Sequence, residues 1–301
     1  MLRAFYLKYL TGKQKQVVKS KYNQFKKIVV NALFSYDGAA LQAKLRQMGI
    51  AKTDTLLVHA NFEPDSGFKG SPGDIVNALM EYVGREGNLM MVSIPFRGSA
   101  FDHLMKNKTF YIQKTVSMMG LVTETFRRKE GVLRSFHPTH PVLVYGKDAA
   151  WLADGHDRCL YPCGPDSPFD KFRRLKGKIL FFDVGFGAIT FFHYVEDLIK
   201  DKLPFEVYHP EPFSAPAYDE KNQLHQIKTY AFNKNVVRRA DKLEEEMSMG
   251  NLIKKGKIGR SNLILVEAED VVGRQTSMVE AGNLPYDLPK NPIPTPAESL
   301  K

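Results

Sequence analysis

The stretch 178–197, KILFFDVGFGAITFFHYVED, decides the fold prediction, because it joins a strand to a helix through a glycine turn. Residues 178–184 form a short apolar run rich in aromatic residues, which predicts a buried strand. Two glycines break this run, and Thr190 then suits the N-cap of a helix that continues to Ile199. A strand that ends in a turn and feeds a helix is the usual place of a site in an α/β sheet.

The start of this helix carries two residues with acid–base chemistry. His193 and Glu196 are three residues apart, so they share one face of the helix. A carboxylate beside an imidazole can fix its tautomer and raise its basicity. This makes His193 a candidate general base and Glu196 its orienting group. The pair also fits a histidine that only packs in a helix start, since this spacing is common on helices.

Strands and helices alternate along the rest of the chain and predict an α/β fold. Strands at 55–58 and 88–94, with a helix at 75–83 between them, form a βαβ unit. We therefore expect a mostly parallel central sheet flanked by helices. Further expected elements are helices at 39–48, 119–128 and 241–249, strands at 142–145, 226–232 and 262–267, a substrate loop at 96–117 and a loop-rich region at 151–171.

Composition places this chain among globular proteins. Its 301 residues are 43% hydrophobic and 25% charged, which allows a sizeable core. No apolar run reaches the length that spans a bilayer, and the first residues do not match a signal peptide. Two cysteines, Cys159 and Cys163, make no disulfide framework, so we expect a cytoplasmic protein.

Most of the net charge of +10 lies in a short N-terminal segment. Residues 1–35 contain eight lysines and arginines and no acidic residue, whereas the other 35 basic residues nearly balance 33 acidic ones. A balanced main body argues against nucleic acid as a partner. We expect residues 1–35 to be a basic helical extension, either solvated or in contact with the inner membrane surface or a partner. The main domain would span 36–282, and proline-containing residues 283–301 would form a tail.

Signature motifs of the common cofactor classes do not occur in this sequence. His156, Cys159 and Cys163 could contribute to a zinc site, but paired Cys-x-x-Cys hooks and a fourth ligand are missing. HYVED at 193–197 is not the His-Glu-x-x-His of zinc proteases, and no dinucleotide fingerprint, P-loop or Gly-x-Ser-x-Gly elbow is found. We therefore expect no metal, and neither an oxidoreductase, a kinase nor a serine hydrolase. Basic residues at 127–134 suit either a phosphate ligand or the end of a helix.

Several motifs in order resemble the aminoglycoside 3-N-acetyltransferase family over about residues 37–275. The matching pieces are Val58-His59, Met119-Gly120, Phe126-Arg127, Arg134-Ser135-x-His137-Pro138, His156, the turn at 164–168, Thr190-x-x-His193-x-x-Glu196 and Gly256-x-Ile258-Gly259. The resemblance implies an α/β fold that is unrelated to the GNAT fold. It also implies that an amine of an amino sugar attacks the thioester of acetyl-CoA directly.

The resemblance further implies roles for particular residues. His193 and Glu196 match the family's catalytic pair, and Thr190 would hydrogen-bond the thioester carbonyl or the CoA arm. Acetyl-CoA, the co-substrate, would contact His59, Ala60, Asn61, Phe62, Met119, Gly120, Arg127, Arg134, Ser135, His137 and Thr190. The candidate substrate-binding residues are Asp102, Glu124, His156 and Asp166.

Three hypotheses on function follow. The first is an acetyl-CoA-dependent N-acetyltransferase for an amino sugar, most like an aminoglycoside 3-N-acetyltransferase of antibiotic resistance. The second places the acceptor among nucleotide-linked or polysaccharide amino sugars of cell-envelope synthesis, because acidic residues that would meet a polycation are scattered. The third is an inactive CoA-binding or scaffolding relative, because the family's His-Ser-Ser stands here as His59-Ala60-Asn61. A homodimer is a further expectation from the family.

Overall fold

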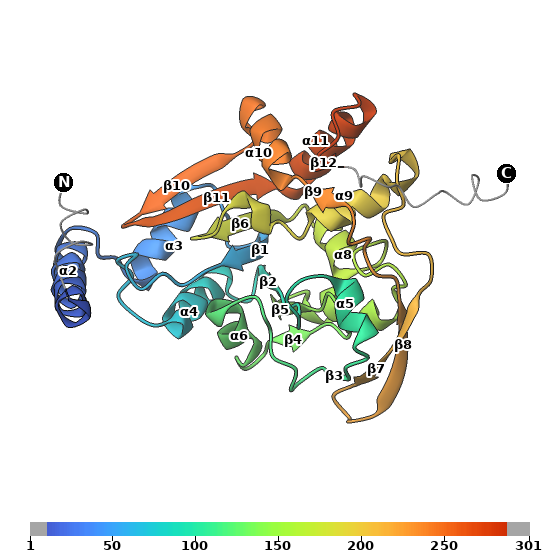
Figure 1. Cartoon of the computed structure of the whole chain (residues 1–301), viewed down its shortest axis with the longest axis horizontal. Coiled ribbons are helices and arrows are strands. Elements are labelled where there is room, and N and C mark those ends of the chain that lie inside the picture. Colours follow the sequence, from blue (N-terminus) through green and yellow to red (C-terminus); the bar gives the residue numbers. More distant parts are fainter. Residues whose placement is uncertain (1–10, 288–301) are drawn as a thin grey trace.

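The computed structural model describes residues 11–287, so residues 1–10 and most of the predicted tail lie outside the described residues. Its centre is a seven-stranded sheet with helices on both faces (Figure 1). The alternation of strands and helices predicts this α/β class correctly. In sheet order the strands are β10 (Lys254–Ile258), β11 (Ser261–Glu267), β6 (Lys178–Phe182), β1 (Thr55–Ala60), β2 (Asn88–Val92), β5 (Val142–Gly146) and β4 (Leu133–Arg134).

The sheet is mixed, and the prediction of a mostly parallel sheet is wrong. Only β1 runs parallel to both of its neighbours, β6 on one side and β2 on the other. All four outer pairs are antiparallel. The βαβ rhythm holds for the three central strands alone, whereas β10 and β11 are joined by a two-residue turn that only an antiparallel pair allows.

The central strands feed two separate cores, one on each face of the sheet. Leu57 belongs to one core and its neighbours Leu56 and Val58 to the other, because side chains alternate along a strand. Helices α3, α4 and α6 pack on the Leu56 face, and α7 to α11 pack on the Leu57 face. The helices are α2 (Gly12–Leu33), α3 (Gly38–Gln47), α4 (Pro72–Val83), α5 (Ala100–Met105), α6 (Leu121–Arg127), α7 (Ala149–Ala153), α8 (Pro168–Arg174), α9 (Phe192–Leu198), α10 (Ala240–Met249) and α11 (Ala268–Glu280).

Two small β elements stand beside the main sheet. One has the strand order β3 (Phe110–Tyr111), β7 (Phe213–Tyr218) and β8 (Leu224–Thr229), and β7 and β8 form the long hairpin at the lower right of Figure 1. The other pairs β9 (Val237–Arg238) with β12 (Tyr286–Asp287). The predicted substrate loop at 96–117 therefore contains regular structure, since it contributes α5 and β3.

Most predicted elements are confirmed to within a few residues, but three differ. The region 151–171, expected to be loop, holds the end of α7, the 3-10 helix η1 (His156–Arg158) and the start of α8. Thr190 is not the N-cap of α9, because the 3-10 helix η2 (Phe186–Ala188) and a turn precede the helix and no side chain caps it. Helix α11 has no predicted counterpart, since polar residues interrupt its apolar stripe.

The described part of the N-terminal segment is one long helix at the edge of the molecule (Figure 1). Helix α2 starts with a capping box between Thr11 and Gln14. Several of its apolar side chains, Tyr22 and Phe25 among them, are exposed. Among the described residues, no helix is both long and apolar enough to cross a membrane.

Candidate active site

A cleft of about 500 Å³ opens beside the carboxyl ends of the parallel strands. Ile94, which follows β2, lines one part of it, and His193, which follows β6 through the glycine turn, lines another. Apolar walls come from Phe96, Met119 and Phe232. The strand-to-helix corner of 178–197 therefore places its histidine at a cleft, as the sequence predicts.

At this cleft, His193 belongs to a hydrogen-bonded network of three side chains, the other two being Glu196 and Arg238. Its Nδ1 lies 2.9 Å from Oε2 of Glu196. Glu196 is fully buried and also accepts from Nε of Arg238, at 3.1 and 3.2 Å from its two oxygens, while Nη2 lies 3.0 Å from Oε1. Since a quarter of the His193 side chain is exposed, this hydrogen-bonded network extends from the buried Glu196 to the cleft.

This arrangement selects one tautomer of His193. A carboxylate oxygen can only accept a hydrogen bond, so Nδ1 carries the hydrogen that lies between the two residues. The second nitrogen, Nε2, then has a free lone pair on the cleft side. Arg238 compensates the charge of Glu196 and holds both of its oxygens, so the carboxylate cannot rotate away from the imidazole.

Aromatic contacts fix the plane of the His193 ring. Phe232 stacks on it with ring centroids 4.2 Å apart, and His140 meets it edge-on at 6.1 Å. Burial, followed by the nearby His193 and His156, lowers the pKa of His140 well below its usual range. His140 is therefore uncharged at neutral pH, so it does not repel the positive charge that His193 gains with a proton.

Three residues around His193 are not among the predicted site residues: His140, Phe232 and Arg238. His140 lies three positions after the matched His137, and that proximity is the one signal that could have found it. Arg238 lies 42 residues beyond Glu196 on β9, so no local spacing connects the two.

Comparisons with known proteins identify the family. A family model described as aminoglycoside 3-N-acetyltransferase matches residues 57–280, which is well over half of the chain. This chain belongs to the aminoglycoside 3-N-acetyltransferase family. Among its relatives, aminoglycoside N(3)-acetyltransferase VII of Streptomyces paromomycinus is 23% identical over 252 residues, covering 77% of this chain and 87% of the relative.

Two solved structures of the family share the fold. AAC-IIIb, in a binary complex with CoASH, has a TM-score of 0.70 and 20% identity over 87% of this chain and 99% of the other. AAC-VIa, bound to sisomicin, has a TM-score of 0.69 and 22% identity over 82% of this chain and 98% of the other. The family resemblance drawn from the ordered motifs is confirmed.

Within this family fold, the end of β1 and the start of α6 come together. A Cβ built on Gly120 would lie 3.9 Å from the carbonyl oxygen of Ala60, and the adjacent Met119 lines the cleft. His59 stacks on Phe181, and burial lowers its pKa to about 4. Its Nε2 is buried without a hydrogen-bond partner among the described residues.

The two residues that follow Ala60 are less enclosed. Asn61 is exposed, and its side-chain amide donates to Glu63. Phe62 is half-buried and packs against the core of the Leu56 face. Of the residues predicted for acetyl-CoA, His59 to Phe62 thus lie at the end of β1 close to Gly120, whose neighbour Met119 lines the cleft.

Four of the other five residues predicted for acetyl-CoA are committed to internal contacts, namely Arg127, Arg134, Ser135 and His137. Arg134 is buried and donates to the backbone oxygens of Ser93 and Thr115, at 2.9 and 2.6 Å. Burial lowers its pKa to about 9. Its guanidinium holds the segment after β2 through these hydrogen bonds. Arg127 pairs with Glu124 and also donates to the carbonyl of Gln113.

Ser135, His137 and His156 form a fully buried cluster behind the cleft. The Ser135 hydroxyl lies 2.7 Å from Nδ1 of His156, and the two histidine rings stack at 4.5 Å. Nε2 of His156 lies 2.8 Å from the carbonyl oxygen of Pro162. Both nitrogens of His156 are therefore occupied, which argues against its predicted contact with substrate.

The predicted acidic substrate contacts are dispersed over the surface. Glu124 is held by Arg127, Arg128 and the Ser117 backbone, and although burial opposes it, these hydrogen bonds lower the pKa of Glu124 to about 2. Asp166, just before α8, pairs with Arg174 at 2.9 Å. Of the predicted set, only Asp102 stands near the cleft, where it pairs with the cleft residue Lys234 at 2.7 Å.

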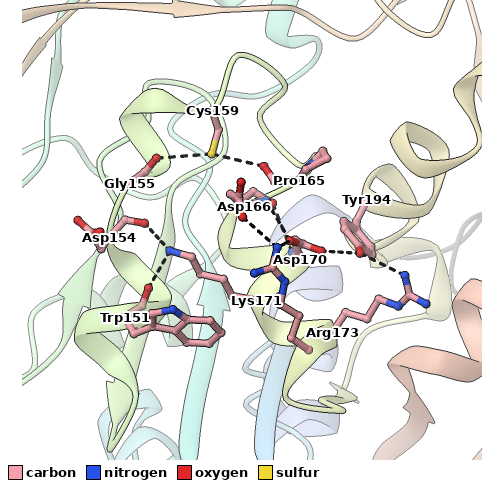
Figure 2. A network of polar contacts seen from close by, with 12 residues as sticks. Trp151, Asp154, Gly155, Cys159, Pro165, Asp166, Asp170, Lys171, Arg173 and Tyr194 are labelled. Atoms are coloured by element: carbon pink, nitrogen blue, oxygen red, sulfur yellow. Dashed lines mark hydrogen bonds and ion pairs between the residues drawn. The ribbon is translucent and has the colours of Figure 1, made fainter.

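A network of polar contacts joins α8 to Tyr194 of α9 (Figure 2). Tyr194, the residue after His193, donates to Asp170 at 2.8 Å, and burial raises the pKa of Tyr194 to about 12. The neighbouring Lys171 is buried and donates to the carbonyl oxygens of Trp151 and Asp154, at 2.8 and 2.6 Å. Helix α8 thereby connects α7 to the helix that carries the histidine.

Thr190 and the two cysteines take no visible part in the cleft. The Thr190 backbone oxygen accepts from the His193 N–H at 3.0 Å, but the residue does not line the cleft. Cys159 and Cys163 are free and buried, and burial raises the pKa of Cys159 to about 11. In the part of the chain that the structure describes, no group of three or more His, Cys, Asp or Glu side chains could hold a metal ion.

Proposed function

We propose that this chain is an acetyl-CoA-dependent N-acetyltransferase that acetylates an amine of an amino sugar. The observation that carries the proposal is the His193–Glu196–Arg238 chain, which ends in a free imidazole nitrogen at the cleft. An ammonium group cannot attack a carbonyl, so such a reaction needs a base at this point. The chain's membership of the family supports the same chemistry.

In the proposed reaction, the acceptor nitrogen attacks the acetyl carbonyl carbon of acetyl-CoA. The new C–N bond forms while the C–S bond breaks, and Nε2 of His193 takes the proton that the nitrogen loses. The same proton then passes to the CoA thiolate, so His193 returns to its neutral form. Glu196 stabilises the transient imidazolium, and Arg238 keeps Glu196 in place. Holding both reactants side by side supplies much of the remaining rate.

Acetyl-CoA enters this proposal as a co-substrate. The relative AAC-IIIb forms a binary complex with CoASH. In this chain, the residues that would contact it are the segment from His59 to Phe62 and the Met119-Gly120 pair, and the approach of Gly120 to Ala60 beside the cleft residue Met119 supports this. Thr190 remains a predicted contact of the thioester. The buried Arg134 is better described as a support of the segment after β2.

The first acceptors to test are aminoglycosides, because another relative, AAC-VIa, binds sisomicin. An amino sugar of the cell envelope remains the second candidate. Three other expectations also remain predictions. They are a main domain at 36–282, a homodimer, and a peripheral contact of residues 1–35 with a membrane or a partner.

Release of the CoA thiol from acetyl-CoA, measured over a panel of aminoglycosides and amino sugars, tests the proposal. Thiol release that depends on an added amine and on His193 is the expected result. CoA binding without thiol release for any amine would instead favour the inactive relative.

A further inference from the structure

The lining of the His193 cleft is rich in cations and lacks acids. Arg97, Lys234 and Arg238 line it together with His140 and His193. Among the described residues that form its walls, none is Asp or Glu. Polycationic ligands such as aminoglycosides need carboxylates to replace the water around their ammonium groups. This cleft offers none on its surface.

Two carboxylates that contact lining residues are already paired. Asp102 lies 2.7 Å from Nζ of Lys234 and accepts a second hydrogen bond from Ser99. Glu196 is fully buried behind His193 and is bound by Arg238. An incoming ammonium group would therefore have to displace an existing ion pair before either acid could receive it.

The cations, in contrast, include one that is unpaired. Arg97 lines the cleft and is exposed, and none of the described residues forms a hydrogen bond or ion pair with its guanidinium. The electrostatic potential beside the cleft is also positive. Burial lowers the pKa of His103, and the charges of Lys108 and Lys106 lower it further. The ring of His103 stacks on Phe96 of the cleft wall at 4.7 Å.

Acidic side chains do gather elsewhere, but in a separate pocket. Glu63, Asp65 and Asp183 line a pocket at the ends of β1 and β6, together with Arg260. None of the cleft residues takes part in it. A cation bound there would not present its amine from within the His193 cleft.

We propose that the His193 cleft takes an amino sugar that also carries an anionic group of the phosphate or carboxylate class, which the unpaired Arg97 binds. This inference rests on the proposed N-acetyltransferase function and narrows its acceptor. Guanidinium groups bind phosphate and carboxylate through paired hydrogen bonds. The same contact orients the amine toward Nε2 of His193 and keeps polycations out.

Kinetics with matched acceptors test this inference on the full chain. The probes are glucosamine, glucosamine 6-phosphate, a uridine-diphosphate-linked glucosamine and sisomicin, each with acetyl-CoA and a thiol readout. We expect at least one of the two anionic probes to exceed glucosamine and sisomicin in kcat/KM by about tenfold or more. A higher kcat/KM for sisomicin than for both anionic probes would overturn the inference and leave the proposed function intact. Absence of thiol release with all four would overturn both.

Variants then locate the anion. Arg97→Gln should lower kcat/KM for the preferred anionic acceptor about tenfold, with an unchanged KM for acetyl-CoA. Arg85→Gln is the matched control, because Arg85 is exposed in the segment that precedes β2, whereas the cleft follows it. Asp102→Asn, which frees Lys234, should raise the same kcat/KM. If Arg97→Gln instead raises KM for acetyl-CoA equally with every acceptor, the cation serves the phosphates of CoA and the inference is wrong.

Discussion

Replacing Glu196 with glutamine should abolish most of the catalysis while leaving the shape of the site nearly intact. In the native protein, Glu196 accepts from His193 on one side and from Arg238 on the other. A glutamine amide has one accepting oxygen and one donating nitrogen. Because the Arg238 guanidinium can only donate, the oxygen will face Arg238 and the NH₂ group will face His193.

This orientation reverses the tautomer of the imidazole. Nδ1 of His193, 2.9 Å from position 196, must then accept a hydrogen bond, and the ring hydrogen moves to Nε2. A protonated Nε2 cannot take a proton from the acceptor amine. The loss should approach the full contribution of a general base, about 10²- to 10⁴-fold in kcat. Since one hydrogen bond to Arg238 survives, unfolding free energy should fall by only about 1–3 kcal/mol.

The assay is thiol release at saturating acetyl-CoA, combined with urea unfolding to exclude loss of structure. KM for acetyl-CoA should change little, because Glu196 is buried and does not line the cleft. Glu196→Asp, which restores an accepting carboxylate, should recover part of kcat. A kcat within about threefold of the native value in Glu196→Gln would refute the tautomer argument.

Three further predictions concern stability and the N-terminal helix. The pKa of His59 is about 4 in the folded protein and about 6.5 when unfolded, so the unfolded chain binds the extra proton between these values. The contribution of neutral His59 to the free energy of unfolding is therefore complete above pH 6.5. It falls as the pH drops toward 4, by about 2 kcal/mol between pH 7.5 and 5.0. Urea unfolding at both pH values should show a smaller loss in His59→Gln, and an equal loss would contradict the assignment. Lys171→Met leaves the carbonyl oxygens of Trp151 and Asp154 without a donor, so unfolding free energy should fall by about 1–3 kcal/mol, and an unchanged urea midpoint would argue against the clamp. Removing residues 1–35 should preserve kcat/KM, because the family match starts at residue 57, and its loss would show that the segment contributes to the site.

The sequence predicts best where chemistry is local. The apolar run before the glycine turn predicts β6, and the three-residue spacing of His193 and Glu196 predicts their contact, because both depend on backbone geometry alone. The direction of the outer strands depends instead on which strands pair across the whole sheet. For that reason the βαβ rhythm gives the three central strands correctly and the antiparallel edges wrongly.

The rest of the site could not be read from local pattern. Arg238 reaches Glu196 only because β9 folds back beside α9, and no spacing along the chain indicates it. Arg134 shows the opposite difficulty. A cationic residue in a matched motif suggests a phosphate ligand, but the sequence does not reveal that its guanidinium is buried and bound to backbone oxygens.

The most direct test of His193 as the general base is to measure both the turnover of His193→Ala and its affinity for CoA. Thiol release by the variant should fall at least about a hundredfold with any acceptor that the native protein uses. Its Kd for CoA, measured by calorimetry, should stay within about threefold of the native value, because the imidazole removes a proton and does not hold the nucleotide. Turnover close to native, with CoA still bound, would contradict the assignment of His193 as the base.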